Sequence, residues 1–142
     1  EALAAAGAQV TGIDLGRAAL AAAEAHRRET GLDIAYRRID AESLAEQNPA
    51  SFEVVVCMEL LEHVPDPSSI VQACARLAKP GGHLFFATLN RNPWSYLLAI
   101  VAAEYLLGLV PRGTHRYDRF IKPRELIDWA QSAGLKTAAS IL

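Results

Sequence analysis

The chain has few cysteines and no long block of residues of one charge, and these absences exclude several classes of protein. Cys57 and Cys74 are its only cysteines. They are too few for a disulfide scaffold and lack C-x-x-C spacing, so a reducing cytoplasm is expected. The net charge is −2 and no basic tail is present, which argues against nucleic acid as a partner. No repeat or low-complexity linker interrupts the chain.

The length suits one domain. Of the 142 residues, 51% are apolar and 21% are charged, proportions that are ordinary for a globular α/β protein. The sequence does not begin with Met, and no secretory signal pattern is present. It opens inside an alanine-rich helical stretch, and residues 140–142 read as the start of a strand. We therefore expect an internal piece of a longer protein, forming a single incomplete domain over residues 1–142.

Helical and strand-like segments alternate along the chain with short connections, an order that predicts a Rossmann-like, doubly wound and mainly parallel sheet of the α/β class. The apolar run at residues 52–58 is typical of a strand buried on both faces. Lys79–Gly82 reads as a tight turn into the strand that follows it. Strands are expected at 9–13, 34–37, 52–58 and 83–88, and helices at 1–6, 16–30, 43–47, 68–78 and 122–133.

Three strand ends carry residues that suit a nucleotide cofactor. Asp14 follows the first expected strand, where a carboxylate can accept hydrogen bonds from ribose hydroxyls; the alternative is a helix cap. Asp40 and Ala41 follow the second strand, where Asp40 can accept from the exocyclic amine of an adenine or can simply form a turn. Met58 ends the third strand, where its thioether can pack on a flat base or belong to the core.

Glu59, Glu62 and His63 form the densest group of metal-ligating side chains. At i, i+3 and i+4, two carboxylates and an imidazole can converge on one point. Hard oxygens with one nitrogen suit a divalent ion such as Mg²⁺, Mn²⁺ or Zn²⁺. The alternative is a helix start in which Glu62 and His63 are solvated and Glu59 caps backbone amides. His63 is also a candidate general base, because an imidazole exchanges protons near neutral pH.

Residues 93–110 are rich in large apolar side chains at a place where a doubly wound domain needs only a connection. The run is shorter than the ~20 apolar residues of a bilayer span, and Glu104 interrupts it. We interpret residues 93–120 as an insertion that docks on a membrane interface or covers an apolar substrate. The alternative is a buried core helix with a solvated basic loop. Basic residues follow the apolar run: Arg112, His115, Arg116, Arg119 and Lys122.

Six sequence blocks carry a family resemblance: Val10–Asp14, Cys57–Pro67, Thr88–Asn92, Ala103–Tyr105, Val110–His115 and Phe120–Pro123. Together they resemble the S-adenosylmethionine-dependent methyltransferases of the Rossmann-like class, and more narrowly the ubiquinone-biosynthesis O-methyltransferase family. The resemblance extends over essentially the whole chain, from the family's second strand onward. The family's first strand with its Gly-rich loop, and its final strands, are missing from this sequence.

The resemblance implies methyl transfer from S-adenosylmethionine to a phenolic or catechol hydroxyl of a polyprenylated precursor, of the 3-demethylubiquinol and 2-polyprenyl-6-hydroxyphenol type. It implies that Asp14 binds the cofactor ribose and that Met58 lies against the cofactor. Glu59, Glu62 and His63 match the family's divalent-metal position, with Mg²⁺ as the expected ion. Because the Gly-rich loop is missing, this chain alone is expected to be inactive.

A bilayer-soluble substrate also implies a location and partners. The enzyme is expected in the cytoplasm, peripheral to the cytoplasmic face of the inner membrane. Its expected partners are the polyprenylated substrate, an anionic membrane surface and other ubiquinone-biosynthesis proteins.

Other functions are compatible with parts of the same pattern. One is a methyltransferase that acts on another small molecule. A nicotinamide oxidoreductase would share Asp14 after a strand, but no hydride-transfer constellation is evident in the sequence. A non-catalytic lipid-binding or scaffolding protein would share the apolar insertion.

Overall fold

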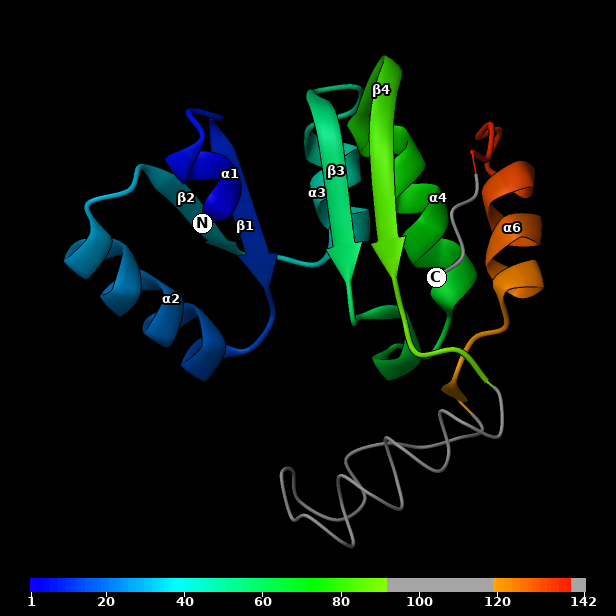
Figure 1. Cartoon of the computed structure of the whole chain (residues 1–142), viewed down its shortest axis with the longest axis horizontal. Coiled ribbons are helices and arrows are strands. Elements are labelled where there is room, and N and C mark those ends of the chain that lie inside the picture. Colours follow the sequence, from blue (N-terminus) through cyan, green and yellow to red (C-terminus); the bar gives the residue numbers. More distant parts are fainter. Residues whose placement is uncertain (92–118, 139–142) are drawn as a thin grey trace, which may run out of the picture. The chain divides into compact units, whose positions relative to one another are not determined.

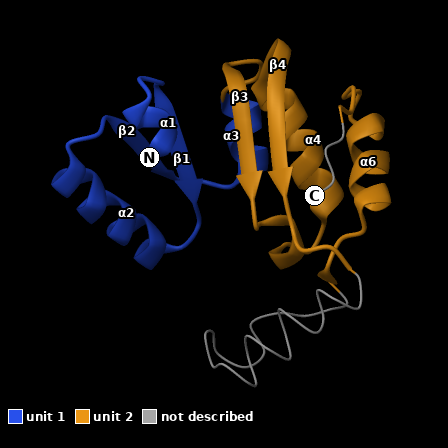
Figure 2. Ribbon diagram, in the orientation of Figure 1, with its two compact units in different colours: residues 1–47 blue, residues 48–142 orange. Residues whose placement is uncertain are grey.

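The structure, a computed structural model, describes residues 1–91 and 119–138, in which helices and strands alternate (Figure 1). These residues form two compact units, 1–47 and 48–142 (Figure 2). The expected insertion at residues 93–120 lies outside the described residues, except for Arg119 and Phe120. The helices are α1 (Ala2–Ala5), α2 (Arg17–Thr30), α3 (Ala41–Gln47), the 3₁₀ turn η1 (Leu61–His63), α4 (Pro67–Leu77) and α6 (Pro123–Ser132), and the strands are β1 (Val10–Asp14), β2 (Ile34–Arg38), β3 (Phe52–Met58) and β4 (Ala78–Ala87).

The first unit is built on the parallel pair β1 and β2, joined through α2. The strands are in register from Val10 opposite Ile34 to Asp14 opposite Arg38, and α2 packs against both strands. The helix ends at Gly31, whose left-handed φ of 69° lets its N–H reach the carbonyl of Arg27 at 2.9 Å. The predicted strand–helix–strand order of this unit is therefore confirmed.

The second unit repeats this plan with β3 and β4. The two strands are parallel, from Val54 opposite His83 to Met58 opposite Ala87, and α4 packs against both strands. In the doubly wound order 3-2-1-4-5, the second strand pairs with the third and the fourth with the fifth. If β1 to β4 are counted as the second to the fifth strand of that order, the observed pairs β1–β2 and β3–β4 match it. Both cysteines are buried as free thiols in the core of this unit. The buried residues that form this core are Cys57, Leu61, Ile70, Val71, Ala73, Cys74, Leu77, Phe120, Ile121 and Ala130.

The segment Lys79–Gly82 is part of a strand, so the prediction of a turn before the strand was wrong. Ala78 lies opposite Phe52 and His83 lies opposite Val54, so β4 has three more residues than β3 between these pairs and forms a bulge. A Cβ at Gly82 would lie 2.9 Å from the Glu53 carbonyl oxygen. Pro and Gly signalled a local reversal, but pairing with β3 keeps the chain extended on both sides of the bulge.

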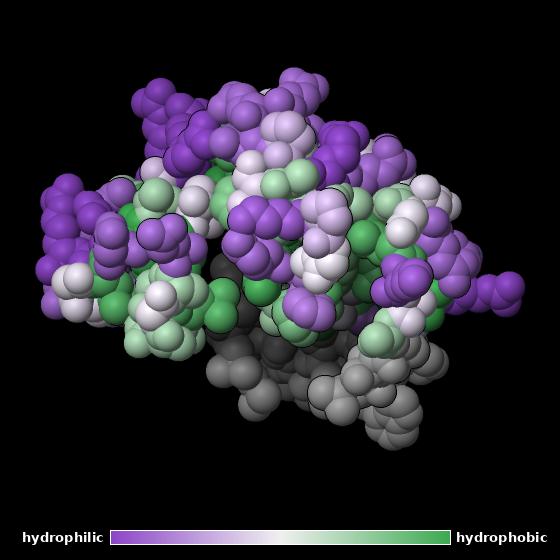
Figure 3. Space-filling view, turned by 90° about the horizontal axis from the view of Figure 1, so that it is seen from above, coloured by the Kyte–Doolittle hydropathy of each residue, from purple (hydrophilic) through white to green (hydrophobic). Residues whose placement is uncertain are grey.

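The strand β3 is less buried than its apolar sequence predicted. Val54, Val56 and Met58 are 44%, 47% and 57% exposed. They alternate along the strand, so they share one face, and Phe85, opposite Val56, is also exposed. The alternate residue Cys57 is buried. One face of the pair therefore packs into the core, whereas the other is exposed, and apolar residues reach the surface in the view of Figure 3.

The start of α4 depends on Asp66. Its Oδ1 accepts hydrogen bonds from the backbone N–H groups of Ser68 and Ser69 at 3.0 and 3.3 Å, and from the Ser68 hydroxyl at 2.7 Å. Pro67 occupies the first helical turn, where a missing N–H costs nothing. The Ser68 hydroxyl, followed by the backbone N–H of Ser69, lowers the pKa of Asp66.

We expect the melting temperature at neutral pH to fall in the order wild type, Asp66→Asn, Asp66→Ala, because Asn keeps a capping oxygen and Ala does not. A carboxyl whose pKa is lower in the folded state stabilises the fold above its unfolded pKa, and this stabilisation is lost as the pH falls through the folded pKa. The wild type should therefore lose its advantage over Asp66→Asn below about pH 4. Thermal unfolding across pH measures this, and a constant difference down to pH 2 would contradict it.

Candidate functional site

Asp14 is the last residue of β1 and Asp40 follows the end of the neighbouring strand β2, so the first unit places both at one edge of its sheet. Asp14 is exposed, and its Oδ1 accepts a hydrogen bond from the Gly16 N–H at 2.6 Å. That bond closes the turn into α2 and fixes the orientation of the carboxylate. Asp14 therefore helps to form the turn before α2 and does not cap the helix, whose N-cap is Gly16. Its ribose contact stays a prediction.

Asp40 caps α3. Its Oδ1 accepts a hydrogen bond from the Ser43 N–H at 2.6 Å, and this bond is the largest cause of the lowered pKa of the carboxyl. Ala41, the first residue of α3, is buried. The turn-forming role of Asp40 is thus observed, and the contact of Asp40 and Ala41 with an adenine stays a prediction.

Met58 ends β3 on the exposed face of the β3–β4 pair, and 57% of its surface is exposed. The alternative of a core methionine is therefore wrong. An exposed, polarisable thioether at the carboxyl end of a parallel strand is in a suitable place to contact a flat ligand. The cofactor contact itself stays a prediction.

Glu59, Glu62 and His63 do not share a helix in the structure. Glu59 has a left-handed φ of 51°, and its N–H donates to the Ala87 carbonyl at 2.9 Å. Of these three residues, only Glu62 and His63 belong to η1. The i, i+3, i+4 geometry on which convergence was predicted is therefore not formed. Among residues 1–91 and 119–138, no group of three His, Cys, Asp or Glu side chains is placed to hold a metal ion.

Glu62 is buried, contrary to the alternative in which it is solvated. It is 4% exposed, and its Oε2 accepts a hydrogen bond from the Thr88 hydroxyl at 2.8 Å. Thr88 follows β4, and Glu62 follows β3, so the contact joins the carboxyl ends of the two paired strands. His63, in contrast, is exposed. The three residues therefore have different environments, and only Glu62 is fixed in the interior.

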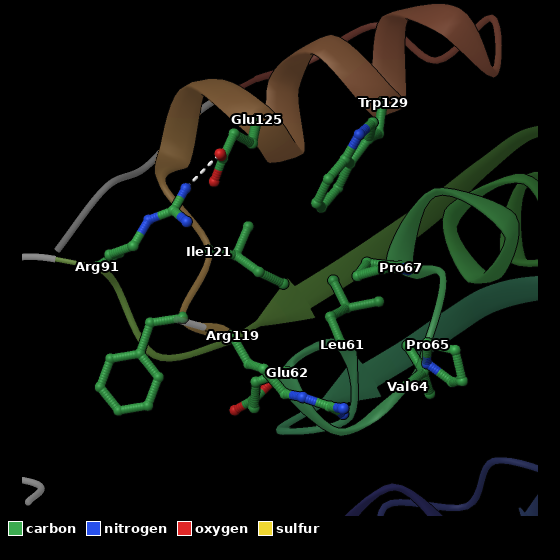
Figure 4. A pocket seen from close by; sticks show the side chains of 11 residues that line it. Leu61, Glu62, Val64, Pro65, Pro67, Arg91, Arg119, Ile121, Glu125 and Trp129 are labelled. Atoms are coloured by element: carbon green, nitrogen blue, oxygen red, sulfur yellow. Dashed lines mark hydrogen bonds and ion pairs between the residues drawn. The ribbon is translucent and has the colours of Figure 1, made fainter. Parts of the chain in front are cut away.

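A cavity of about 290 Å³ lies beside Glu62, between η1 and α6 (Figure 4). One apolar wall comes from η1 and the segment after it: Leu61, Val64, Pro65 and Pro67. The facing apolar wall comes from α6 and the residues before it: Phe120, Ile121 and Trp129. Four charged residues complete the lining: Glu62, Arg91, Arg119 and Glu125.

Backbone and charged contacts hold the α6 side of this cavity in place. The Ile121 N–H donates to the Leu89 carbonyl at 3.0 Å, and Arg91 forms an ion pair with Glu125 (Figure 4). Glu125 also accepts from the Lys122 N–H at 2.8 Å. This backbone bond, more than Arg91, lowers the pKa of Glu125.

Sequence reasoning missed Thr88, Arg91, Glu125 and Trp129 as parts of one site. A partial signal existed for Glu125, because an acidic residue three positions after a helix N-cap typically bonds back to the cap. The contacts of Thr88 with Glu62 and of Arg91 with Glu125 span 26 and 34 residues. No short-range pattern could have indicated them.

Comparison with known proteins defines the class of the chain. Residues 1–86 match the model of a methyltransferase domain family, and the chain belongs to that family. Solved structures support the fold. A putative methyltransferase from Bacillus halodurans has a TM-score of 0.66 and 24% identity, covering 89% of this chain and 53% of that one. A structure from echinomycin biosynthesis has a TM-score of 0.71 and 21% identity, covering 90% and 54%.

More similar relatives narrow the comparison. A ubiquinone biosynthesis O-methyltransferase of Pseudomonas entomophila (strain L48) is 58% identical over 136 residues, which are 96% of this chain and 59% of the relative. The protein of the same name from Pseudomonas fluorescens (strain Pf-5) is 58% identical over 135 residues, covering 95% and 58%. This chain therefore spans somewhat more than half the length of these relatives. Among its described residues, no helix is both long and apolar enough to cross a membrane.

Proposed function

We propose that the chain forms the central part of an S-adenosylmethionine-dependent O-methyltransferase of ubiquinone biosynthesis, which methylates phenolic or catechol hydroxyls of polyprenylated precursors. The observation that carries this proposal is the 58% identity over 136 residues with relatives of that name. We assign the activity to a longer protein, because the relatives extend well beyond the matched region. The match to a methyltransferase domain family favours this function over an oxidoreductase or a lipid-binding scaffold.

The reaction needs a deprotonated acceptor oxygen aligned with an electrophilic methyl group, which S-adenosylmethionine supplies when bound. Residues at the carboxyl ends of the strands fit such a ligand. The exposed carboxylate of Asp14 can accept bonds from ribose hydroxyls, and the exposed thioether of Met58 can contact the cofactor. Asp40, next to Ala41, can accept from an adenine amine. His63 is exposed beyond β3. It is the candidate for removing the proton of the acceptor hydroxyl as an alternative to holding a metal, because a metal-bound imidazole nitrogen cannot also take the proton.

Replacing Asp14 should weaken the binding of S-adenosylhomocysteine, because charge-assisted hydrogen bonds to the ribose would be lost. Such bonds contribute ~1.5–3 kcal/mol each, so Asp14→Ala should raise the Kd at least about tenfold, and Asp14→Asn should raise it less. Calorimetric titration of the full-length protein measures both. Asp33→Ala, at another exposed aspartate of the same unit, is the control. An unchanged Kd in Asp14→Ala would reject the ribose role.

A divalent metal is a separate proposal. The residues as arranged here do not fit a metal site, because Glu59 and His63 are exposed whereas Glu62 is buried and bonded to Thr88. Binding would require Glu59 and His63 to join Glu62 around one ion. What supports the proposal is the chemistry of the three donors, which suits Mg²⁺.

If the metal proposal is correct, Mg²⁺ should bind the full-length protein with measurable heat, and Glu59→Gln or His63→Ala should each weaken binding roughly tenfold or more. Glu46→Gln, at an exposed glutamate elsewhere, should have no effect. Equal Mg²⁺ affinity in all the variants would remove Glu59 and His63 from the site.

Association with the cytoplasmic face of the inner membrane is also proposed, because a polyprenyl substrate partitions into the bilayer. The support is the sequence of residues 93–120, apolar and then basic, most of which lies outside the described residues. Basic side chains would add electrostatic attraction to an anionic surface. Other ubiquinone-biosynthesis proteins are also proposed as partners, because the relatives with 58% identity are named for ubiquinone biosynthesis.

Neutralising Arg112, Arg116, Arg119 and Lys122 should lower binding to anionic vesicles, and binding of the wild type should fall as salt is added. Each charge near the surface contributes about 1 kcal/mol, so removing the four together should lower the partition coefficient by more than tenfold. Vesicle co-sedimentation measures this. Wild-type binding that is equal on neutral and anionic vesicles would contradict the proposal.

A further inference from the structure

Two side chains that line the cavity between η1 and α6 each carry a buried polar atom with no hydrogen-bond partner within the described residues: Oε1 of Glu62 and Nε of Arg91. Both atoms are buried, with almost no surface exposed to solvent. A buried polar group without a partner costs about 1–3 kcal/mol, and more when it is charged. Such a cost is typical of a position that a ligand completes.

The two unpaired atoms are complementary. Thr88 donates to Oε2 of Glu62, which leaves Oε1 as an acceptor without a partner. Glu125 accepts from Nη2, one of the two terminal nitrogens of Arg91, and Nε is a donor without a partner. The side chains that line the cavity therefore carry one unsatisfied acceptor and one unsatisfied donor. Because both atoms are buried, each side chain has to rotate before its free atom can meet a ligand.

Size, charge and wall chemistry limit the ligand. The volume of about 290 Å³ is near the lower limit of ligand pockets, about 300 Å³, and suits a single substituted ring. The two guanidinium groups of Arg91 and Arg119 balance the two carboxylates, which favours a neutral ligand over an ion. Trp129 and Ile121 offer apolar surface to a ring. The cavity lies past the carboxyl ends of β3 and β4, where parallel sheets bind ligands.

We propose that this cavity binds the hydroxylated aromatic ring of the methyl acceptor. Glu62 Oε1 accepts a hydrogen bond from a ring hydroxyl, and Arg91 Nε donates one to an oxygen of the same ring. The proposal rests on the proposed function for the identity of the ring, and it adds Arg91, Trp129 and Glu62 as residues that contact it. It requires no metal at Glu62.

Ring binding can be measured separately from methyl transfer. The full-length protein is prepared with Trp94→Phe, and any tryptophan outside this chain is replaced as well, so that Trp129 is the fluorophore. Catechol is then added in the presence of EDTA, and the fluorescence of Trp129 is measured. Catechol should quench the signal saturably. 1,2-Dimethoxybenzene has the same ring without hydroxyl donors, and it should bind at least about tenfold more weakly because it leaves Glu62 unpaired.

Two substitutions test the contacts. Glu62→Gln turns one oxygen into a donor, and Arg91→Lys keeps a charge for Glu125 but removes Nε. Each should raise the Kd for catechol about tenfold or more. Arg124→Lys makes the same change at an exposed position of α6 and should leave the Kd unchanged. Because Glu62→Gln affects a buried residue, its melting temperature is measured too, and Arg91→Lys keeps the test valid if Glu62→Gln does not fold.

The outcomes separate this proposal from the proposed function. Equal catechol affinity in wild type and Arg91→Lys, with methyl transfer to catechol intact, would overturn the ring site and leave the function standing. Saturable, Arg91-dependent binding without any methyl transfer would support the ring site and reject the function. Binding of catechol only after Mg²⁺ is added would overturn the proposal, because Glu62 would then act through a metal.

Discussion

The parallel pairing of β3 with β4 is the constraint on which the second unit depends. Parallel strands end at the same edge of a sheet, so the segment after Met58 and the segment after Ala87 must meet there. The hydrogen bond between Thr88 and Glu62 joins those two segments, and the Glu59 N–H bonds to the Ala87 carbonyl beside it. The position of η1, and of the cavity that it lines, follows from this pairing.

A buried carboxylate at this edge is costly, and the structure offsets that cost only in part. Glu62 is 4% exposed, with one oxygen bonded and the other without a partner in the described residues. The left-handed backbone of Glu59 adds strain in a residue with a side chain. Unfavourable terms of this kind cluster at functional sites more often than elsewhere. They support a site in this unit without identifying what it binds.

The residues that directly follow β4 contact the residues at the start of α6. Leu89 and Ile121 form a backbone hydrogen bond, Asn90 and Ile121 form an isolated parallel bridge, and Arg91 pairs with Glu125. These contacts hold residues 89–91 against the start of α6. One wall of the cavity is therefore supported by several contacts, as an accurate binding site requires.

The sequence by itself determined the elements, their order and their caps, because these depend on neighbours within a few residues. Asp66 and Pro67 start α4, Gly31 ends α2, and the limits of β3 agree with the apolar run that predicted them. Only the tertiary structure decided the bulge at Lys79–Gly82, the exposed face of β3 and the separation of Glu59 from Glu62. Each of these depends on pairing or packing with a segment more than 20 residues away. The helical spacing that suggested a three-residue cluster failed for this reason: the bond of Glu59 to Ala87 removes it from the helix, and the bond of Thr88 to Glu62 draws that carboxylate inside.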